Sequence, residues 1–356
     1  MEHRLVIFAG AGASFGVSSR YPMTKQFFDE LPSGVTGSDL FKRLTTFLSS
    51  KNSIDIEDVL WTLGDLLDAV ESATAEGRIL KFLLRKNALQ ALLGSGPSGN
   101  DFASQLSHLQ RLAGDLQRKI HDEVYRFYSA LPAADDLNRT WTPLLRWARG
   151  LSPQKVDIVT TNYDRVLESA LDTIDDLPVD TGKRASVEVR LNLALWDKSS
   201  QGDKGLLTKL HGSVDWTLAG TDSAGQPIIR WGQPEHQGLH DNRGIIYPGF
   251  KGSPEKEPFK SFHDYFGTAA SKATHLLFIG FAFRDDYIND LLARSLSPTA
   301  KIAVIDPASM LPDLPFLKNI KHLQIGFGAS EPIAVPAMPS SAPGWLNELQ
   351  HWAEQT

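Results

Sequence analysis

The residues Gly10-Ala11-Gly12-Ala13-Ser14 directly follow an apolar run, 5–8, near the start of this 356-residue chain. Glycine lets a backbone turn sharply and approach a ligand closely. Backbone N–H groups at such a turn, with a helix start behind them, bind anions such as a pyrophosphate. Glycine turns that bind nothing also follow strands, so this turn alone does not establish a nucleotide site.

Two later segments place polar residues after predicted strands. Asn162 and Asp164 follow the β-branched segment 156–159, and His211 follows the apolar segment 206–210. Taken singly, Asn162 reads as a turn or helix-cap residue and His211 as a hydrogen-bonded core histidine. Ligands of open α/β sheets bind at the carboxyl ends of the strands, so the three strand ends together indicate a site. Histidine exchanges a proton near neutral pH and therefore suits general-base catalysis.

The glycine turn departs from two common phosphate-binding motifs. Phe15 stands where the dinucleotide-binding fingerprint has its third glycine, and Gly16 follows it. The lysine of a phosphate-binding P-loop is absent, because Lys25 lies too far along the chain. An ordinary dehydrogenase and a P-loop NTPase are therefore disfavoured.

This ordered set of segments resembles the sirtuin-like (Sir2-type) superfamily. Residues 10–14 resemble its first nucleotide-binding motif, 161–164 its Gln-Asn-Ile-Asp motif, and His211-Gly212 its catalytic His-Gly pair. Further segments lie in the same order: 245–249 stands where the family has an apolar segment leading to a glycine, 279–282 replaces its Gly-Thr-Ser, and 304–306 lies near its last adenosine-binding segment. The resemblance therefore extends over residues 5–306.

The resemblance implies a site for NAD+. Cleavage of the nicotinamide–ribose bond passes through an oxocarbenium-like transition state, so the site must orient the ribose and place a water. His211 is then the general base, Asn162 holds a ribose hydroxyl or the attacking water, and Asp164 faces the nicotinamide amide. The other residues implied to bind NAD+ are Gly10, Ala11, Gly12, Ala13 and Ser14 at the pyrophosphate, Gly280 and Phe281 on the adenine side, and Asp306 at the adenosine ribose.

The absence of cysteine separates this chain from the protein-deacylating sirtuins. Their four-cysteine zinc site cannot exist here, and thiol catalysis is excluded as well. The divergence resembles the bacterial sirtuin-like NADases of antiphage defence, which implies a hydrolase that releases nicotinamide and ADP-ribose without a metal. Three alternatives stay open: an NAD- or ADP-ribose-sensing module without turnover, an ADP-ribosyl transferase, and a zinc-free deacylase.

Charge and composition restrict the partners. The formal net charge of −6 argues against broad nucleic-acid binding by the chain alone, which leaves only indirect or weak contact. The longest apolar runs, such as 276–283, are too short for a membrane span, and zero cysteines fit the cytoplasm. The resemblance implies control from outside, so we expect a homo-oligomer and a partner such as a HerA-type ATPase or another defence sensor.

The order of predicted elements indicates an α/β protein with a Rossmann-like doubly wound parallel sheet and a large helical insertion. We assign 1–36 and 151–330 to the NAD-binding core, 37–150 to the insertion, and 331–356 to a proline-rich strap and C-terminal helix. Helices are expected at about 77–93, 101–130, 140–149, 259–272, 286–295 and 345–353, an extended segment at 187–195 and a hairpin at 214–232.

Overall fold

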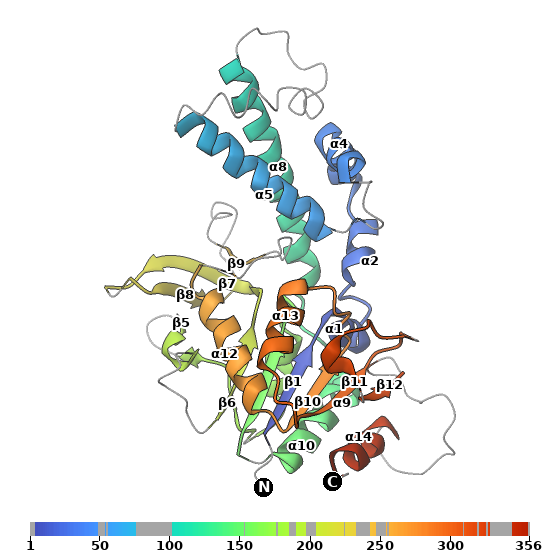
Figure 1. Cartoon of the computed structure of the whole chain (residues 1–356). Coiled ribbons are helices and arrows are strands. Elements are labelled where there is room, and N and C mark those ends of the chain that lie inside the picture. The colour runs from blue at the N-terminus through green and yellow to red at the C-terminus, as the bar shows by residue number, and fades with distance from the viewer. Residues whose placement is uncertain are drawn as a thin grey trace. The chain divides into compact units, whose positions relative to one another are not determined.

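The computed structural model describes residues 4–48, 54, 56–75, 102–152, 154–175, 177–184, 190–196, 204–223, 225–232, 243–246, 254, 256–308, 310–318, 320–324, 327 and 344–354. The chain forms two compact units (Figure 1). The larger unit comprises Met1–Tyr21, Phe127–Ile246 and Lys251–Thr356, and the smaller comprises Pro22–Arg126 and Tyr247–Phe250.

A seven-stranded parallel sheet forms the centre of the larger unit, in the order β12-β11-β10-β1-β2-β6-β3. Its strands are β1 (Leu5–Ala9), β2 (Val156–Thr160), β3 (Val179–Asp180), β6 (Gly205–Lys209), β10 (His275–Ile279), β11 (Lys301–Ile305) and β12 (Lys321–Leu323). β1 pairs with β2 on one side and with β10 on the other, so the strand order reverses at β1. This arrangement confirms the predicted doubly wound parallel sheet.

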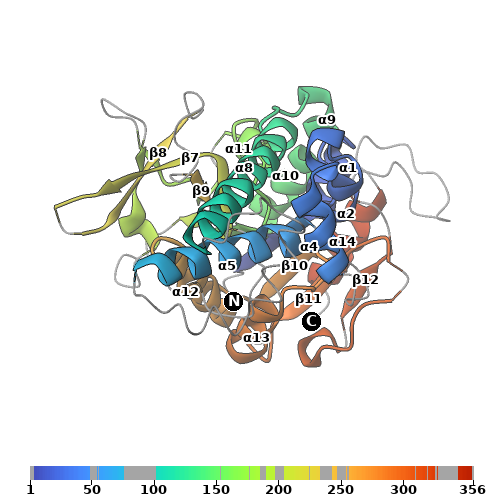
Figure 2. The same cartoon turned by 90° about the horizontal axis from the view of Figure 1, so that it is seen from above.

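Helices cover both faces of this sheet, which is why its central strands are buried along their whole length. On one face Leu5 and Ile7 pack with α1 (Ala11–Val17), α9 (Ala134–Arg139), α10 (Trp141–Leu151), α11 (Val166–Leu171) and α14 (Gly344–Glu354). On the other face Val6 and Phe8 pack with α12 (Phe259–Lys272) and α13 (Asp286–Ser295). Figure 2 shows α10 and α12 on opposite sides of the strands.

A second, antiparallel sheet with the order β4-β5-β8-β7-β9 adjoins this core. Its strands are β4 (Lys183–Arg184), β5 (Arg190–Leu191), β7 (Gly212–Thr221), β8 (Pro227–Trp231) and β9 (Arg243–Ile245). The hairpin predicted at 214–232 is confirmed as β7 and β8. The prediction of an extended segment at 187–195 is wrong in part, because its end belongs to the 3₁₀ helix η1 (Leu193–Trp196). This helix turns Trp196 inward, and the indole N–H donates to Thr208 Oγ1 at 2.9 Å.

The smaller unit is helical. It contains α2 (Thr24–Asp29), α3 (Ser33–Thr36), α4 (Asp39–Leu48), α5 (Ile56–Ala75) and most of α8 (Phe102–Tyr128). α5 packs against α2 and α4 through an apolar stripe with helical spacing that includes Val59, Leu63 and Val70. The predicted helix at 77–93 and the proline-rich strap at 332–343 lie outside the described residues.

The unit boundaries differ from those that the sequence suggested. Residues 22–36 belong to the smaller unit, and α9 and α10 belong to the larger one, although 37–150 was assigned to the insertion. The apolar face of α10 explains the difference, because Trp141 and Leu144 are fully buried with the residues of β1 and β2. An apolar helix stripe looks the same in sequence whether it covers a sheet or another helix. In the described part of the chain, no helix is both long and apolar enough to cross a membrane.

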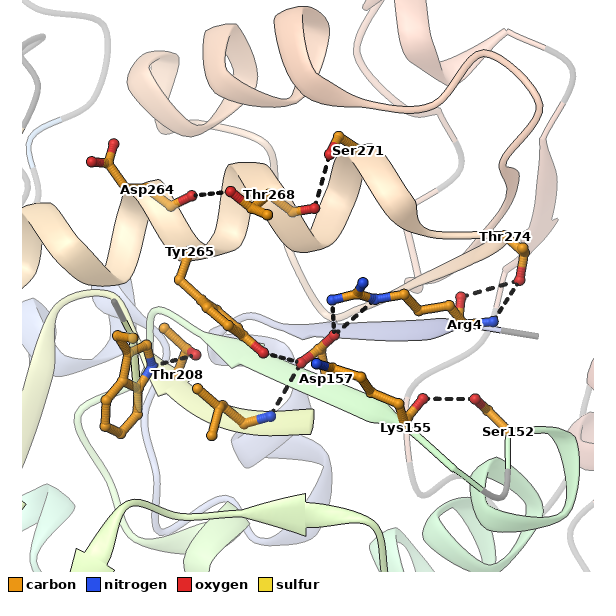
Figure 3. Close-up of polar contacts among 12 residues, drawn as sticks. Arg4, Ser152, Lys155, Asp157, Thr208, Asp264, Tyr265, Thr268, Ser271 and Thr274 are labelled. Atoms are coloured by element: carbon orange, nitrogen blue, oxygen red, sulfur yellow. Dashed lines mark hydrogen bonds and ion pairs between the residues drawn. The ribbon is translucent and has the colours of Figure 1, made fainter. Parts of the chain in front are cut away.

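A buried carboxylate ties the amino ends of the strands together (Figure 3). Asp157 of β2 is fully buried and accepts hydrogen bonds from Arg4 Nη2 at 3.2 Å, from the Tyr265 hydroxyl at 2.5 Å and from Leu206 N–H at 3.1 Å. Arg4 directly precedes β1, Tyr265 lies on α12 and Leu206 lies on β6. Burial and the neighbouring carboxylate raise the pKa of Tyr265, which keeps its hydroxyl protonated as a donor.

We expect Asp157→Ala to lower the free energy of unfolding by about 3 kcal/mol, because it leaves three donors without their common acceptor. Tyr265→Phe removes one of the four hydrogen bonds to the Asp157 carboxylate and should cost about 1 kcal/mol. Urea unfolding of both variants measures the difference. Equal costs for the two would contradict the central place of Asp157 in this network.

Candidate functional site

The turn after β1 and the turn after β10 touch through their backbones. Gly10 N–H donates to Ile279 O and Gly12 N–H donates to Gly280 O, both at 2.9 Å. A Cβ on Gly12 would lie 2.8 Å from Gly280 Cα, and a Cβ on Gly280 would collide with Ala13 N. Gly280 also has a φ of +55°, which side-chain-bearing residues rarely adopt. Glycine is therefore required on both sides of this contact.

These hydrogen bonds use up most of the backbone N–H groups that were predicted to bind the pyrophosphate. The N–H groups of Gly10 and Gly12 are engaged with β10, and Ala13 N–H donates to Gly10 O at 2.9 Å. Ala11 is exposed, and its N–H has no partner within the described residues. Ala11 is thus the one residue of 10–13 whose N–H is left for an anion at this turn.

Asn162 connects the glycine turn to the loop after β2. Its Nδ2 donates to Gly10 O and to Ser14 Oγ, each at 2.8 Å. The Ser14 hydroxyl in turn hydrogen-bonds the Asp164 carboxylate. All three side chains are buried. Ser14 was predicted to bond a pyrophosphate, but in the structure its hydroxyl bridges Asn162 and Asp164.

A buried lysine that sequence reasoning missed lies beneath Asp164. Lys209, 1% exposed at the end of β6, donates from Nζ to Asp164 O and to Glu168 Oε1, the latter at 2.8 Å. Burial raises the pKa of Asp164 and of Glu168, and the Lys209 charge opposes both shifts. The available signal was a lysine inside the otherwise uncharged run 205–210.

His211 is 4% exposed and follows β6. Its Nε2 lies 3.5 Å from Asp285 Oδ2, a contact that the sequence did not predict. Burial pushes the pKa of Asp285 upward, but the hydrogen bond and charge of His211 outweigh it, so the net pKa is lowered. The sequence did contain a sign of this residue, because Asp285 is a carboxylate at the N-cap position of the helix predicted at 286–295.

A second histidine lies beside the first. The rings of His263 and His211 are stacked with their centroids 6.3 Å apart. His263 is buried, and its Nδ1 lies 2.8 Å from Phe259 O. Burial lowers the pKa of His263 to about 4. His263 is therefore neutral at neutral pH and adds no charge beside His211.

The predicted residues follow the carboxyl ends of five neighbouring strands, in the order Asp306, Gly280, Gly10, Asn162 and His211 along β11, β10, β1, β2 and β6. Hydrogen bonds between side chains join Ser14, Asn162 and Asp164 of the predicted set, and the Asn162 side chain also bonds the backbone of Gly10.

Asp306 and Phe281 differ in their suitability for a ligand. Asp306 is partly exposed and accepts Ala308 N–H at its Oδ1, at 2.8 Å, which leaves Oδ2 for another donor. Phe281 is buried, with its ring 4.5 Å from that of Phe8 and 4.9 Å from that of Phe283. Its side chain therefore fills the core, and only its backbone lies at the turn.

A separate cavity of about 740 Å³ lies between η1, β8 and the start of α12. Arg190, Asn192, Asp222, Glu257 and Lys260 are among the residues that line it, and none of the predicted site residues does. Within the described residues, no group of three or more His, Asp or Glu side chains has the arrangement of a metal site.

One family model matches part of the chain. Residues 156–319 match the family model described as SIR2-like domain. The matched segment contains Asn162, Asp164, His211, Gly280 and Asp306, but not the glycine turn at 10–14. A search of curated proteins gave no match.

Solved structures of Sir2 proteins resemble the whole chain at low identity. A mutant Sir2 homologue in complex with ADP-ribose is 11% identical with a TM-score of 0.41, covering 98% of this chain and 91% of its own. A Sir2 homologue in complex with NAD is 12% identical with a TM-score of 0.36, covering 91% and 85%. Sir2 bound to an acetylated peptide is 11% identical with a TM-score of 0.36, covering 91% and 88%. Similarity at this level carries no information about activity.

We expect Gly12→Ala to lower the free energy of unfolding by about 1–3 kcal/mol, because the new methyl group meets the Gly280 backbone. Gly114→Ala is the matched control, since Gly114 also lies in a helix and a Cβ there meets nothing within 4 Å. Alanine favours helix, so the control should be stabilised by up to about 1 kcal/mol. Thermal unfolding of both variants measures these effects. A Gly12→Ala variant that is more stable than the wild type would contradict the close contact between Gly12 and Gly280.

The pKa of His263 predicts a loss of stability in acid. The folded protein binds fewer protons than the unfolded chain between about pH 6.5 and about pH 4, so stability falls as the pH falls through this window. At about pH 4 the loss is about 3 kcal/mol. In His263→Asn the amide can still donate to Phe259 O, but the titrating group is gone. Urea unfolding at about pH 7 and about pH 4 should show a smaller acid loss in this variant, and equal losses would refute the prediction.

Proposed function

We propose that this chain binds NAD+ at the carboxyl edge of its parallel sheet and hydrolyses the nicotinamide–ribose bond. The observation that carries the proposal is the chain of hydrogen bonds from Gly10 through Asn162 and Ser14 to Asp164, with His211 after the adjacent strand. Asn162, Asp164 and His211 lie in the segment that matches the SIR2-like domain. The strand order reverses at β1, where open α/β sheets bind their ligands.

The proposed reaction converts NAD+ and water into nicotinamide, ADP-ribose and a proton. The bond between the nicotinamide nitrogen and the ribose carbon breaks, and its electron pair stays with nicotinamide. A water oxygen forms the new bond to the ribose carbon. Nicotinamide is already a cationic leaving group in NAD+, so the site needs no strong acid. It needs groups that orient the ribose and accept the proton of the water.

The hydrogen bonds of Asn162 define its proposed role. Both hydrogens of its amide are used, one on Gly10 O and one on Ser14 Oγ. Its Oδ1 is therefore the atom left to accept a hydrogen bond from a ribose hydroxyl or from the attacking water. His211 takes the proton from the water. Asp164 is held by Ser14 and by Val166 N–H at 2.9 Å, and it faces the nicotinamide amide in this proposal.

The adenosine half of NAD+ fits the other side of β1. Ala11 N–H is available to the pyrophosphate, and Asp306 Oδ2 is available to the adenosine ribose hydroxyls. Gly280 lies on the adenine side in this proposal and would contact the ligand through its backbone, because Gly12 and Ala13 fill the space that a side chain would take. This assignment leaves Gly10, Gly12 and Ser14 with a structural role in shaping the turn.

We also propose, from the resemblance to bacterial antiphage NADases, that the protein depletes NAD+ as a defence effector when it is triggered. The same resemblance supports a cytoplasmic homo-oligomer that works with a partner such as a HerA-type ATPase or another sensor. Light scattering tests the oligomer, because a monodisperse particle of 39.2 kDa, the mass of one chain, would contradict it.

We expect His211→Ala and Asn162→Ala each to lower the rate of NAD+ cleavage by about 10²-fold or more, the scale of a lost general base or positioning group. His351→Ala is the control, since His351 is exposed on α14 and should leave the rate unchanged. Release of nicotinamide, followed by chromatography, is the measurement. A His211→Ala variant with the wild-type rate would contradict the assigned mechanism.

The products distinguish the alternatives. Hydrolysis releases nicotinamide and ADP-ribose in equal amounts. Nicotinamide without free ADP-ribose, together with a gain in protein mass, indicates ADP-ribosyl transfer. Nicotinamide release that depends on an acylated peptide indicates a zinc-free deacylase. NAD+ binding in calorimetry without any nicotinamide release indicates a sensing module and contradicts the proposed hydrolysis.

A further inference from the structure

The loop between β10 and α13 places the carboxylate of Asp285 next to His211, the proposed general base. Two of its residues have positive φ, Gly280 at +55° and Phe283 at +54°. A left-handed conformation at a buried aromatic residue is strained and persists only where the surroundings hold it. Here Asn289 Nδ2 donates to Phe283 O at 2.8 Å, and the Phe283 ring packs 4.9 Å from that of Phe278. The loop therefore has one defined path, which ends at Asp285.

Asp285 has two tasks, one for each carboxylate oxygen. Its Oδ1 accepts Ile288 N–H at 3.0 Å and so caps α13. Its Oδ2 lies 3.5 Å from His211 Nε2. The cap fixes the carboxylate on the first turn of a ten-residue helix, which orients the second oxygen toward the imidazole. His211 Nδ1 has no hydrogen-bond partner within the described residues.

The two rings that neighbour His211, those of Tyr163 and His263, carry no charge at neutral pH. The Tyr163 ring lies 6.3 Å away on the side of β2, and His263 lies 6.3 Å away on α12. His263 is neutral above about pH 4, and Tyr287 of α13 packs against it at 5.4 Å. The Asp285 carboxylate, 3.5 Å from Nε2, is the ion-pair partner of His211.

We propose that Asp285 is the positioning residue for His211: its carboxylate accepts the Nε2 proton and thereby leaves Nδ1 as the basic nitrogen of the site. The proposal rests on the proposed NAD+ hydrolysis for its catalytic consequence. In that reaction Nδ1 takes the proton of the attacking water, and the imidazolium that forms is stabilised by the Asp285 carboxylate. The Nδ1 proton then passes to solvent, which restores the starting tautomer.

Two substitutions separate this role from helix capping. Asp285→Ser and Asp285→Asn both retain a good N-cap for α13. Serine is too short to reach Nε2, whereas the asparagine oxygen can still accept its proton without a charge. Asp290→Asn is the control, because it removes an exposed negative charge from the same helix. All three proteins should unfold within a few degrees of the wild type.

Nitrogen-15 NMR of the histidine rings tests the tautomer without any need for turnover. The chain has ten histidines, so the signals of His211 are assigned by their loss in His211→Gln. We expect the wild type to show His211 protonated at Nε2 and unprotonated at Nδ1, and Asp285→Ser to show a mixture of tautomers. Protonation at Nδ1 in the wild type, or an unchanged His211 pattern in Asp285→Ser, would overturn the proposal.

Rates of nicotinamide release test the catalytic consequence. We expect Asp285→Ser to lower the rate about 10- to 100-fold, Asp285→Asn to give an intermediate rate, and Asp290→Asn to leave it unchanged. Wild-type rates in both Asp285 variants would refute the positioning role. A wild type that binds but never cleaves NAD+ would instead refute the proposed function, while the NMR result would still decide the His211–Asp285 pair.

Discussion

The contact between the Gly10–Gly12 turn and Gly280 determines where the other site residues lie. Strands β1 and β10 are adjacent, and their two turns meet so closely that no side chain fits between them. This contact fixes Gly10 O as an acceptor for Asn162, which brings the loop after β2 against the same turn. The loop after β10 then continues from Gly280 to Asp285 and reaches His211. Loops after three parallel strands are thus aligned by one backbone contact.

The polar groups buried below this turn are costly to fold. Lys209 with Glu168 and Arg165 with Asp215 form ion pairs at 2.8 and 3.2 Å, and three of these four side chains are almost completely enclosed. A buried ion pair often stabilises a fold less than apolar residues of the same volume would. Such groups gather at functional sites, where charge and position matter more than stability. The contact of Lys209 with Asp164 O is consistent with the proposed site, whereas Asp157 holds the opposite edge of the sheet together.

Sequence alone predicted the features that depend on local pattern. Continuous apolar runs identified β1 and β10 as strands buried on both faces, and strand ends marked by Gly10, Asn162 and His211 identified the edge of the sheet. It failed where the cause is a contact between distant segments. The uncharged run around Lys209 and the N-cap position of Asp285 mark these two residues but do not identify the site residue that each contacts. Phe281 beside a glycine gives no sign that its ring fills the core. The assignment of α10 to the insertion differs from the structure for a similar reason, because an apolar helix face does not show whether it packs on a sheet or on another helix.

We propose the carboxyl edge of the parallel sheet as the NAD+ site. The most direct test is a crystal structure with ADP-ribose, the proposed product, which requires no turnover. We predict the pyrophosphate beside Ala11 N–H, the adenosine ribose at Asp306 and the free ribose between Asn162 and His211. ADP-ribose bound instead in the 740 Å³ cavity lined by Arg190 and Lys260 would contradict the account.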